Sequence, residues 1–152
     1  MLENSFIIVF QGIPIPPSEN ALYRNVPGVG RVKTSEYRQY EKRFLDWARE
    51  HFLEISKAKE IGAETLVDVD CSFFIDQKRL ISQKGRPKKI DTSNRLKALH
   101  DCLARILELD DSYFWGASAV KYPVANEHDE QVVVRITRHN SVPPTWTHFQ
   151  EV

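Results

Sequence analysis

The chain has few cysteines, no net charge and no long apolar run. Its 152 residues include two cysteines, and 21 basic residues balance 21 acidic ones. Two cysteines are too few for a disulfide scaffold. Zero net charge excludes attraction of the whole protein to nucleic acid, so any such binding must come from local patches. No apolar run reaches membrane-spanning length, and the N-terminal residues lack the features of a signal peptide. We therefore expect a cytoplasmic protein without membrane contact.

Glycine-rich loops that hold phosphate are also missing. Residues 25–33 (NVPGVGRVK) are rich in glycine but contain neither a GxGxxG nor a GxxxxGK[ST] pattern. We predict a turn or hairpin there. The preceding segment, residues 13–20, holds three prolines and should run extended along a surface or a sheet edge.

The apolar residues follow the periods of strands and helices. Residues 5–10 form a short apolar run, and residues 65–76 alternate between apolar and polar side chains, as strands do. Residues 117–122 and 131–137 predict two more strands. From Ser35 the period becomes helical, with Thr34 or Ser35 as the cap. A second helix should follow a cap at Asp91, Thr92 or Ser93 and end before Leu109.

This order of elements predicts the fold class and the domain boundaries. With 41% hydrophobic residues, the chain is long enough for one compact domain. We expect an α+β fold over residues 1–138, with a small mixed sheet of about four strands and two helices packed on it. Residues 139–152 should form a tail or an edge wrap. Cys71 and Cys102 fall in a predicted strand and a predicted helix, where we expect buried free thiols.

Acidic residues flank the second predicted helix. Asp91 precedes it, Asp110 and Asp111 follow it, and Lys97 lies near its start. Carboxylates beside basic residues suggest a metal ion that handles phosphate, and oxygen ligands suit Mg²⁺. The alternative is structural: Asp91 would be a helix N-terminal acid, the pair Asp110 and Asp111 would be solvated turn residues, and Lys97 would form an i,i+4 surface pair with Asp101.

A basic segment lies directly before Asp91. Residues 78–89 (KRLISQKGRPKK) carry six basic residues and no acidic one. Such a segment is either a solvated loop or a contact for the phosphates of a nucleic acid. Its position beside Asp91 favours the second interpretation. His100 lies at the border of the apolar helix face, with no second His or Cys at zinc spacing, and is expected to be a packed or half-exposed residue.

Several short motifs together resemble the RusA family of Holliday junction resolvases. They are PPSEN at residues 16–20, YR at 23–24, SEYR at 35–38, DTSNRLK at 91–97 leading into ALHD, LDD at 109–111, and VK at 120–121. The resemblance extends over about residues 6–136. It implies a dimeric, RusA-like fold, Mg²⁺ as cofactor and DNA as partner. The implied function is that of a Mg²⁺-dependent endonuclease that resolves four-way junctions in recombination or repair, of phage or prophage origin.

The resemblance also implies a set of site residues. Asp91, Asp111 and Lys97 match the catalytic positions, with Asp91, Asp111 and the adjacent Asp110 as candidate metal ligands. Ser93 stands where the family has a second aspartate, and a neutral hydroxyl is a poor substitute for a carboxylate toward a hard cation. The candidate DNA contacts are Arg24, Lys33, Arg86, Lys88, Lys89 and Asn94.

Two other functions stay open at this point. The second possibility is a junction- or DNA-binding protein of the same fold, whose cutting is weakened because Ser93 carries no charge. An unrelated small α+β protein whose acids are coincidental is the third possibility.

Overall fold

A mixed four-stranded sheet forms the centre of the protein. The computed structural model describes residues 6–62 and 64–140. The sheet has the order β1-β6-β4-β5, with β1 at Ile7–Ile13, β4 at Val67–Asp76, β5 at Phe114–Val124 and β6 at Gln131–Arg138. Strands β4 and β5 are parallel, and the other pairs are antiparallel. The predicted α+β class with a small mixed sheet is therefore confirmed.

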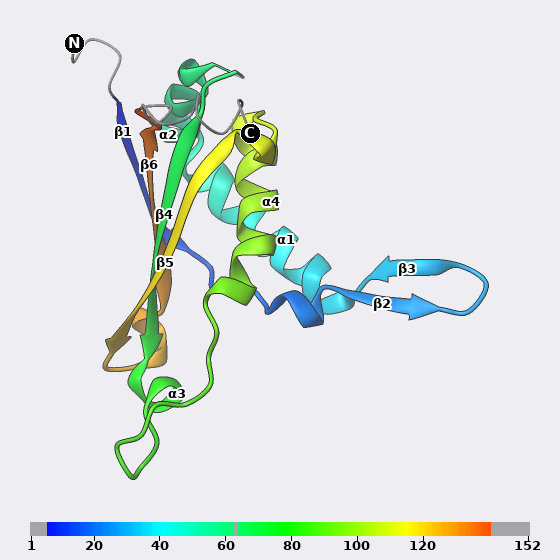
Figure 1. The fold of residues 1–152 in the computed structure, drawn as a ribbon, viewed down its shortest axis with the longest axis vertical. Coiled ribbons are helices and arrows are strands. Elements are labelled where there is room, and N and C mark those ends of the chain that lie inside the picture. The colour runs from blue at the N-terminus through cyan, green and yellow to red at the C-terminus, as the bar shows by residue number, and fades with distance from the viewer. Residues whose placement is uncertain (1–5, 63, 141–152) are drawn as a thin grey trace, which may run out of the picture.

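The main helices cover one face of this sheet (Figure 1). They are α1 at Ser35–Glu50, α2 at Phe52–Ala58 and α4 at Leu96–Leu107. Every second residue of β4 is buried beneath them, as a sheet with one covered face requires. Leu99 and Leu103 of α4 are fully buried, so the apolar face of this helix lies in the core. Cys71 and Cys102 are buried free thiols, and burial raises the pKa of each to about 12.

The first predicted helix is interrupted at His51. Thr34 caps α1, because its side chain accepts a hydrogen bond from the backbone N–H of Tyr37 at 3.1 Å. At the other end His51 has φ −115° and ψ 25°, outside the helical region. Its Nδ1 lies 2.8 Å from the carbonyl oxygen of Trp47, and its ring stacks on that of Trp47. The helical period continues into α2, which buries Ile55. Because the backbone of His51 is not helical, the chain forms two helices there.

A separate two-stranded hairpin projects from the helical side of the molecule (Figure 1). It consists of β2 at Tyr23–Val26 and β3 at Gly30–Lys33, which pair with each other and with no other strand of residues 6–62 and 64–140. The glycines at its turn, Gly28 and Gly30, both have positive φ, a conformation that glycine adopts without strain. The predicted turn or hairpin at residues 25–33 is thus confirmed.

The connection from β4 to β5 carries the predicted site residues. It runs through α3 at Gln77–Leu80, the basic loop, a 3-10 turn η4 at Ser93–Arg95, helix α4 and a second 3-10 turn η5 at Asp111–Tyr113. Parallel strands need such a crossover. Three further 3-10 turns are η2 at Glu19–Ala21, η3 at Lys59–Ile61 and η6 at Glu127–Asp129. In the described part of the chain, no helix is both long enough and apolar enough to span a membrane.

Candidate functional site

Asp91 lies in a basic hollow between the crossover connection and β5. The hollow measures about 410 Å³ and is lined by Lys88, Lys89, Ile90, Asp91, Thr92 and Lys121. The ammonium of Lys121 donates a hydrogen bond to the carbonyl oxygen of Ile90 at 2.9 Å, which fixes the connection against the strand. A carboxylate surrounded by lysines at the surface is a suitable place for a phosphate and a cation together.

Ser93 is the main partner of the Asp91 carboxylate. Its hydroxyl donates to Oδ1 of Asp91 at 2.5 Å, and its backbone N–H donates to the same oxygen at 3.0 Å. The Ser93 hydroxyl is the first cause of a lowered pKa of Asp91, and the charge of Lys121 lowers it further. Asp91 is therefore ionised at neutral pH. The backbone N–H of Asn94 also donates to Oδ1, so these bonds do not occupy Oδ2.

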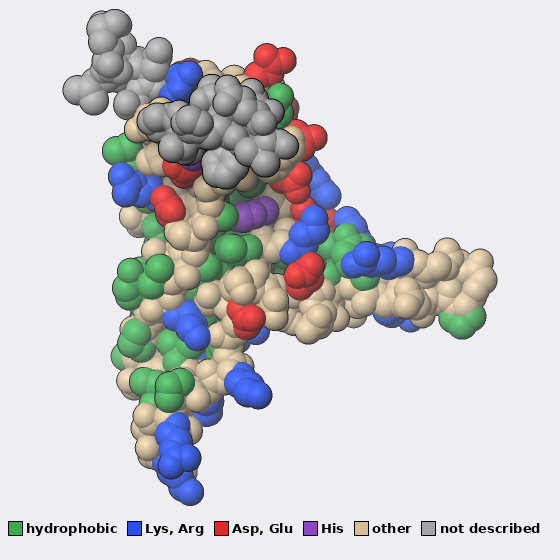
Figure 2. Space-filling view, viewed as in Figure 1, with side chains coloured by type: hydrophobic (Ala, Val, Ile, Leu, Met, Phe, Trp, Pro, Cys, Tyr) green, Lys and Arg blue, Asp and Glu red, His purple; other side chains and the backbone are tan. Residues whose placement is uncertain are grey.

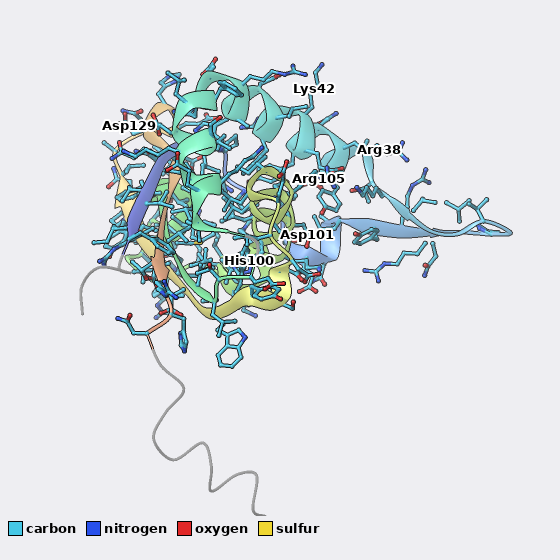
Figure 3. The ribbon with its side chains drawn as sticks, turned by 90° about the horizontal axis from the view of Figure 1, so that it is seen from above. Arg38, Lys42, His100, Asp101, Arg105 and Asp129 are labelled. Carbon is cyan, nitrogen blue, oxygen red and sulfur yellow. The ribbon has the colours of Figure 1, made fainter. Side chains whose placement is uncertain are left out.

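Asp111 lies in a second, acidic hollow beside the base of the hairpin. This hollow of about 320 Å³ is lined by Tyr23, Lys33, Tyr37, Asp101, Ala104, Arg105, Asp110 and Asp111. Figure 3 shows Asp101 and Arg105 on the side of α4 that faces the hairpin. Asp110 accepts a hydrogen bond from the backbone N–H of Ser112 at 2.9 Å, which begins η5 and is the first cause of its lowered pKa.

Lys97 pairs with Asp101, which lines the acidic hollow. Its ammonium donates to Asp101 Oδ1 at 3.2 Å, and the hydroxyl of Tyr37 donates to Asp101 Oδ2 at 3.1 Å. The hydrogen bond to Asp101 is the first cause of the raised pKa of Lys97, and the charge of Asp111 adds to it. Burial and Asp101 together raise the pKa of Tyr37 far above its ordinary value. Lys97 is therefore a cation held by Asp101, and Asp111 favours its charged form.

Asp91 and Asp111 lie beyond opposite ends of α4. The helix has 12 residues, and at a rise of about 1.5 Å per residue it is roughly 18 Å long. The neighbouring strand gives an independent measure. Phe114, the first residue of β5, directly follows the turn η5 that begins at Asp111. Lys121, in the Asp91 hollow, lies seven residues further along β5, which is roughly 23 Å at about 3.3 Å per residue. One metal ion cannot bridge Asp91 and Asp111 of the same chain.

The structure separates the predicted site residues within one chain. Asp91, Asp111 and Lys97 do not converge in a single pocket within one chain, because α4 separates the acids. Among residues 6–62 and 64–140, no three His, Cys, Asp or Glu side chains are placed to hold a metal ion together. Donor type does fit Mg²⁺, since both hollows offer carboxylate oxygens. The role of Asp91, Asp110 and Asp111 as ligands therefore stays a prediction.

The basic loop before Asp91 is ordered by its own backbone bonds. The N–H of Lys88 donates to Leu80 at 2.7 Å, and the N–H of Ser82 donates to Arg86 at 2.8 Å. The side chains of Lys84, Arg86 and Lys89 are exposed, and basic residues gather at this end of the molecule (Figure 2). The Lys88 ammonium donates to the carbonyl oxygen of Lys78 at 2.7 Å. The loop thus presents several cations beside Asp91.

The other candidate DNA contacts lie on the hairpin and at the turn that follows Asp91. Arg24 is exposed on the hairpin. Lys33 forms a salt bridge with Glu41 at 3.0 Å, so part of its charge is already neutralised. Asn94 is half-buried at the turn beside Asp91. His100 packs edge-on against Phe114, and burial lowers its pKa, as expected for a packed histidine.

Sequence reasoning missed the part that Asp101 and Tyr37 play. The i,i+4 spacing indicated the pair Lys97 and Asp101, and that contact is present. The third member, Tyr37, is 64 positions away from Asp101 and belongs to a different helix. No local pattern could have shown that its hydroxyl holds the carboxylate next to Lys97.

Comparison with known proteins points to one family. A family model described as Endodeoxyribonuclease RusA matches residues 14–137, which is most of the chain and includes both hollows. No curated protein matches the chain.

Proposed function

We propose, since this chain belongs to the RusA family of endodeoxyribonucleases, that it is a Mg²⁺-dependent nuclease that cuts four-way DNA junctions during recombination or repair. The observation that carries the proposal is the family match over residues 14–137, because it spans both acid-bearing turns and the helix between them. The basic loop beside Asp91 supports DNA as the substrate, since a neutral protein needs such a local patch to bind a polyanion.

We further propose that two copies of the chain build each active site. Asp91 and Asp111 lie too far apart for one ion within a copy, whereas a two-fold axis between two copies can place the Asp91 end of one α4 beside the Asp111 end of the other. The dimer expected from the sequence would then contain two equivalent sites. Each would combine Asp91 of one copy with Asp110, Asp111 and Lys97 of the other.

In such a site, the chain's own residues have distinct roles. Asp91, Asp110 and Asp111 would hold the ion, which when bound lowers the pKa of water and neutralises charge on the phosphate. Lys97, kept protonated by Asp101, supplies a positive charge to the phosphate oxygens or to the leaving oxygen. Lys88, Lys89 and Arg86 hold the DNA backbone next to Asp91.

A second function is favoured by the contact between Ser93 and Asp91. The Ser93 hydroxyl donates to the carboxylate and adds no negative charge of its own. A site with one charge fewer binds a divalent cation less tightly. The protein would then bind junctions and cut them slowly or not at all.

A single assay separates these functions. The protein is incubated with a synthetic four-way junction and with a linear duplex of the same sequence, in Mg²⁺ and in EDTA. Cutting of the junction in Mg²⁺ alone supports the nuclease. A shifted band with intact strands in both conditions supports the binding protein. If the junction is neither cut nor shifted, both proposals are contradicted.

A further inference from the structure

The hairpin arm, residues 23–33, is held firmly at its base but does not join the main sheet. The hydroxyl of Thr34, the cap of α1, donates to the carbonyl oxygen of Ala21, and its N–H donates to that of Leu22 at 2.9 Å. Leu22 is fully buried. An isolated two-stranded hairpin is marginally stable in water. The arm is therefore oriented by its base, and its outer part has no packing role in the described chain (Figure 1).

The arm is basic along its length. Between Glu19 and Glu36 the chain contains Arg24, Arg31 and Lys33 and no acidic residue. The guanidinium of Arg31 lies over the Tyr23 ring, 4.1 Å from its centroid, which stiffens the side chain and leaves its charge at the surface. Arg24 is exposed. This charge pattern suits a polyanion better than a typical protein surface.

The tip of the arm is apolar. Val29 lies between Gly28 and Gly30 and is 71% exposed. Its N–H donates to the carbonyl oxygen of Val26 at 3.0 Å, so the turn that presents it is ordered. An exposed apolar side chain at the end of a charged β-ribbon has the composition of elements that insert between base pairs.

The arm begins at the acidic hollow. Tyr23 and Lys33, at its base, line the same hollow as Asp101, Asp110 and Asp111. Any DNA whose phosphate reaches Asp111 therefore passes beside the arm. A β-ribbon fits into a DNA groove, and an apolar wedge costs least where bases are already partly unstacked, as at a branch point.

We propose that the hairpin arm recognises the branch point of the junction, with Arg24 and Arg31 on phosphates and Val29 inserted between the bases at the crossover. The inference rests on the proposed function, since it requires junction DNA at the acidic hollow. It assigns to Val29 at the tip of the arm the preference for branched DNA over duplex DNA, while the cations of the arm and of the basic loop bind both.

The test uses Val29→Ser with Leu53→Ser as its matched control. Leu53 lies on α2 and is 81% exposed. Binding is measured with Ca²⁺ in place of Mg²⁺, on a four-way junction and on a linear duplex, with 2-aminopurine at the branch. The wild type should bind the junction with a rise in fluorescence. Val29→Ser should lose that rise and about tenfold of its preference for the junction, because one inserted side chain is lost. Leu53→Ser should match the wild type.

Arg24→Ala tests the phosphate contacts. It should weaken binding to junction and duplex alike, whereas Arg49→Ala, which removes an exposed arginine of α1, should not.

The inference is overturned if Val29→Ser keeps both the fluorescence rise and the preference. It is also overturned if Val29→Ser changes the sedimentation of the DNA-free protein, since the tip would then contact a second copy. A wild type that does not prefer junctions would instead remove the proposed function, and this inference with it.

Discussion

Ser93 stands where the RusA family has a second carboxylate, and its hydroxyl donates a hydrogen bond to Asp91. The hydroxyl of Ser93 neutralises part of the charge on Oδ1 and keeps the pKa of Asp91 low. Asp91 is thereby ready to bind a cation, but it has no acidic neighbour at position 93. The effect of Ser93 on cutting is therefore a matter of cation affinity, which substitution can test.

We predict that Ser93→Asp strengthens Mg²⁺ binding and, if the wild type cuts poorly, raises junction cleavage by at least about tenfold, because a second carboxylate then lies beside Asp91. Titration calorimetry with Mg²⁺ and single-turnover cleavage rates measure the two effects. Ser93→Asn is the control, since it has the shape of Asp without its charge. If Ser93→Asp binds DNA and Mg²⁺ yet cuts no faster than an inactive wild type, the defect lies elsewhere.

The packing of β5 against β4 leaves no space for a side chain at Gly116. Gly116 lies opposite Asp68 in the parallel pair, and a Cβ there would overlap the Asp68 side chain. Asp68 in turn lies 2.7 Å from Nδ1 of His139. The close approach of β5 to β4 at this point therefore requires the absence of a side chain.

Gly116→Ala should destabilise the protein by about 1–3 kcal/mol, the usual cost of adding a methyl group where there is no space. Urea unfolding followed by circular dichroism measures the free energy of unfolding. Ala117→Ser, at the next and exposed position, should change it by less than about 0.5 kcal/mol. Equal stability of Gly116→Ala and the wild type would show that Asp68 moves aside without cost.

The basic loop contributes to DNA binding as one element. Its backbone bonds hold Lys88 and its neighbours in place, so its cations face DNA without a large ordering cost. Lys88→Ala with Lys89→Ala should lower the affinity and reduce the salt dependence by about one unit of slope per lost contact. Filter binding at several salt concentrations measures the slope. Lys42→Ala, on the outer face of α1 (Figure 3), is the control. An unchanged slope in the double variant would show that the loop is only solvated.

At the scale of the whole molecule, the distance between the two hollows makes a prediction about assembly. Asp91→Asn and Asp111→Asn should each be inactive alone. The two variants are then mixed and allowed to exchange subunits. Of the two sites in a mixed dimer, one would carry both Asn residues and the other would carry both Asp residues. We therefore expect the mixture to regain cleavage at one of the two paired strands, seen as nicked junctions on a denaturing gel.

Two results would contradict the shared site. No activity in the mixture, with subunit exchange confirmed by a tagged copy, would place all ligands in one chain. A monomer in sedimentation equilibrium at micromolar concentration would remove the second copy altogether. The control is a mixture of Asp91→Asn with itself, which should stay inactive.

Local patterns in the sequence determined the elements and the chemistry of the candidate residues. Alternation predicted β4, the helical period from Ser35 predicted α1, and the acids at positions 91, 110 and 111 indicated oxygen ligands for a cation. These features depend on neighbours within a few positions, where the periods of strand and helix act directly. The break at His51 was not predicted, because a side chain that bonds a carbonyl four positions earlier leaves the apolar period unchanged.

Only the tertiary structure decided how those residues are arranged. The parallel pairing of β4 and β5 requires a crossover, and that crossover lays α4 along the sheet with Asp91 at one end and Asp111 at the other. The same packing brings Tyr37 to Asp101 and leaves the hairpin arm projecting from the body. Sequence spacing counts residues along the chain, whereas a site depends on distances in space, and these follow from which elements pair and pack.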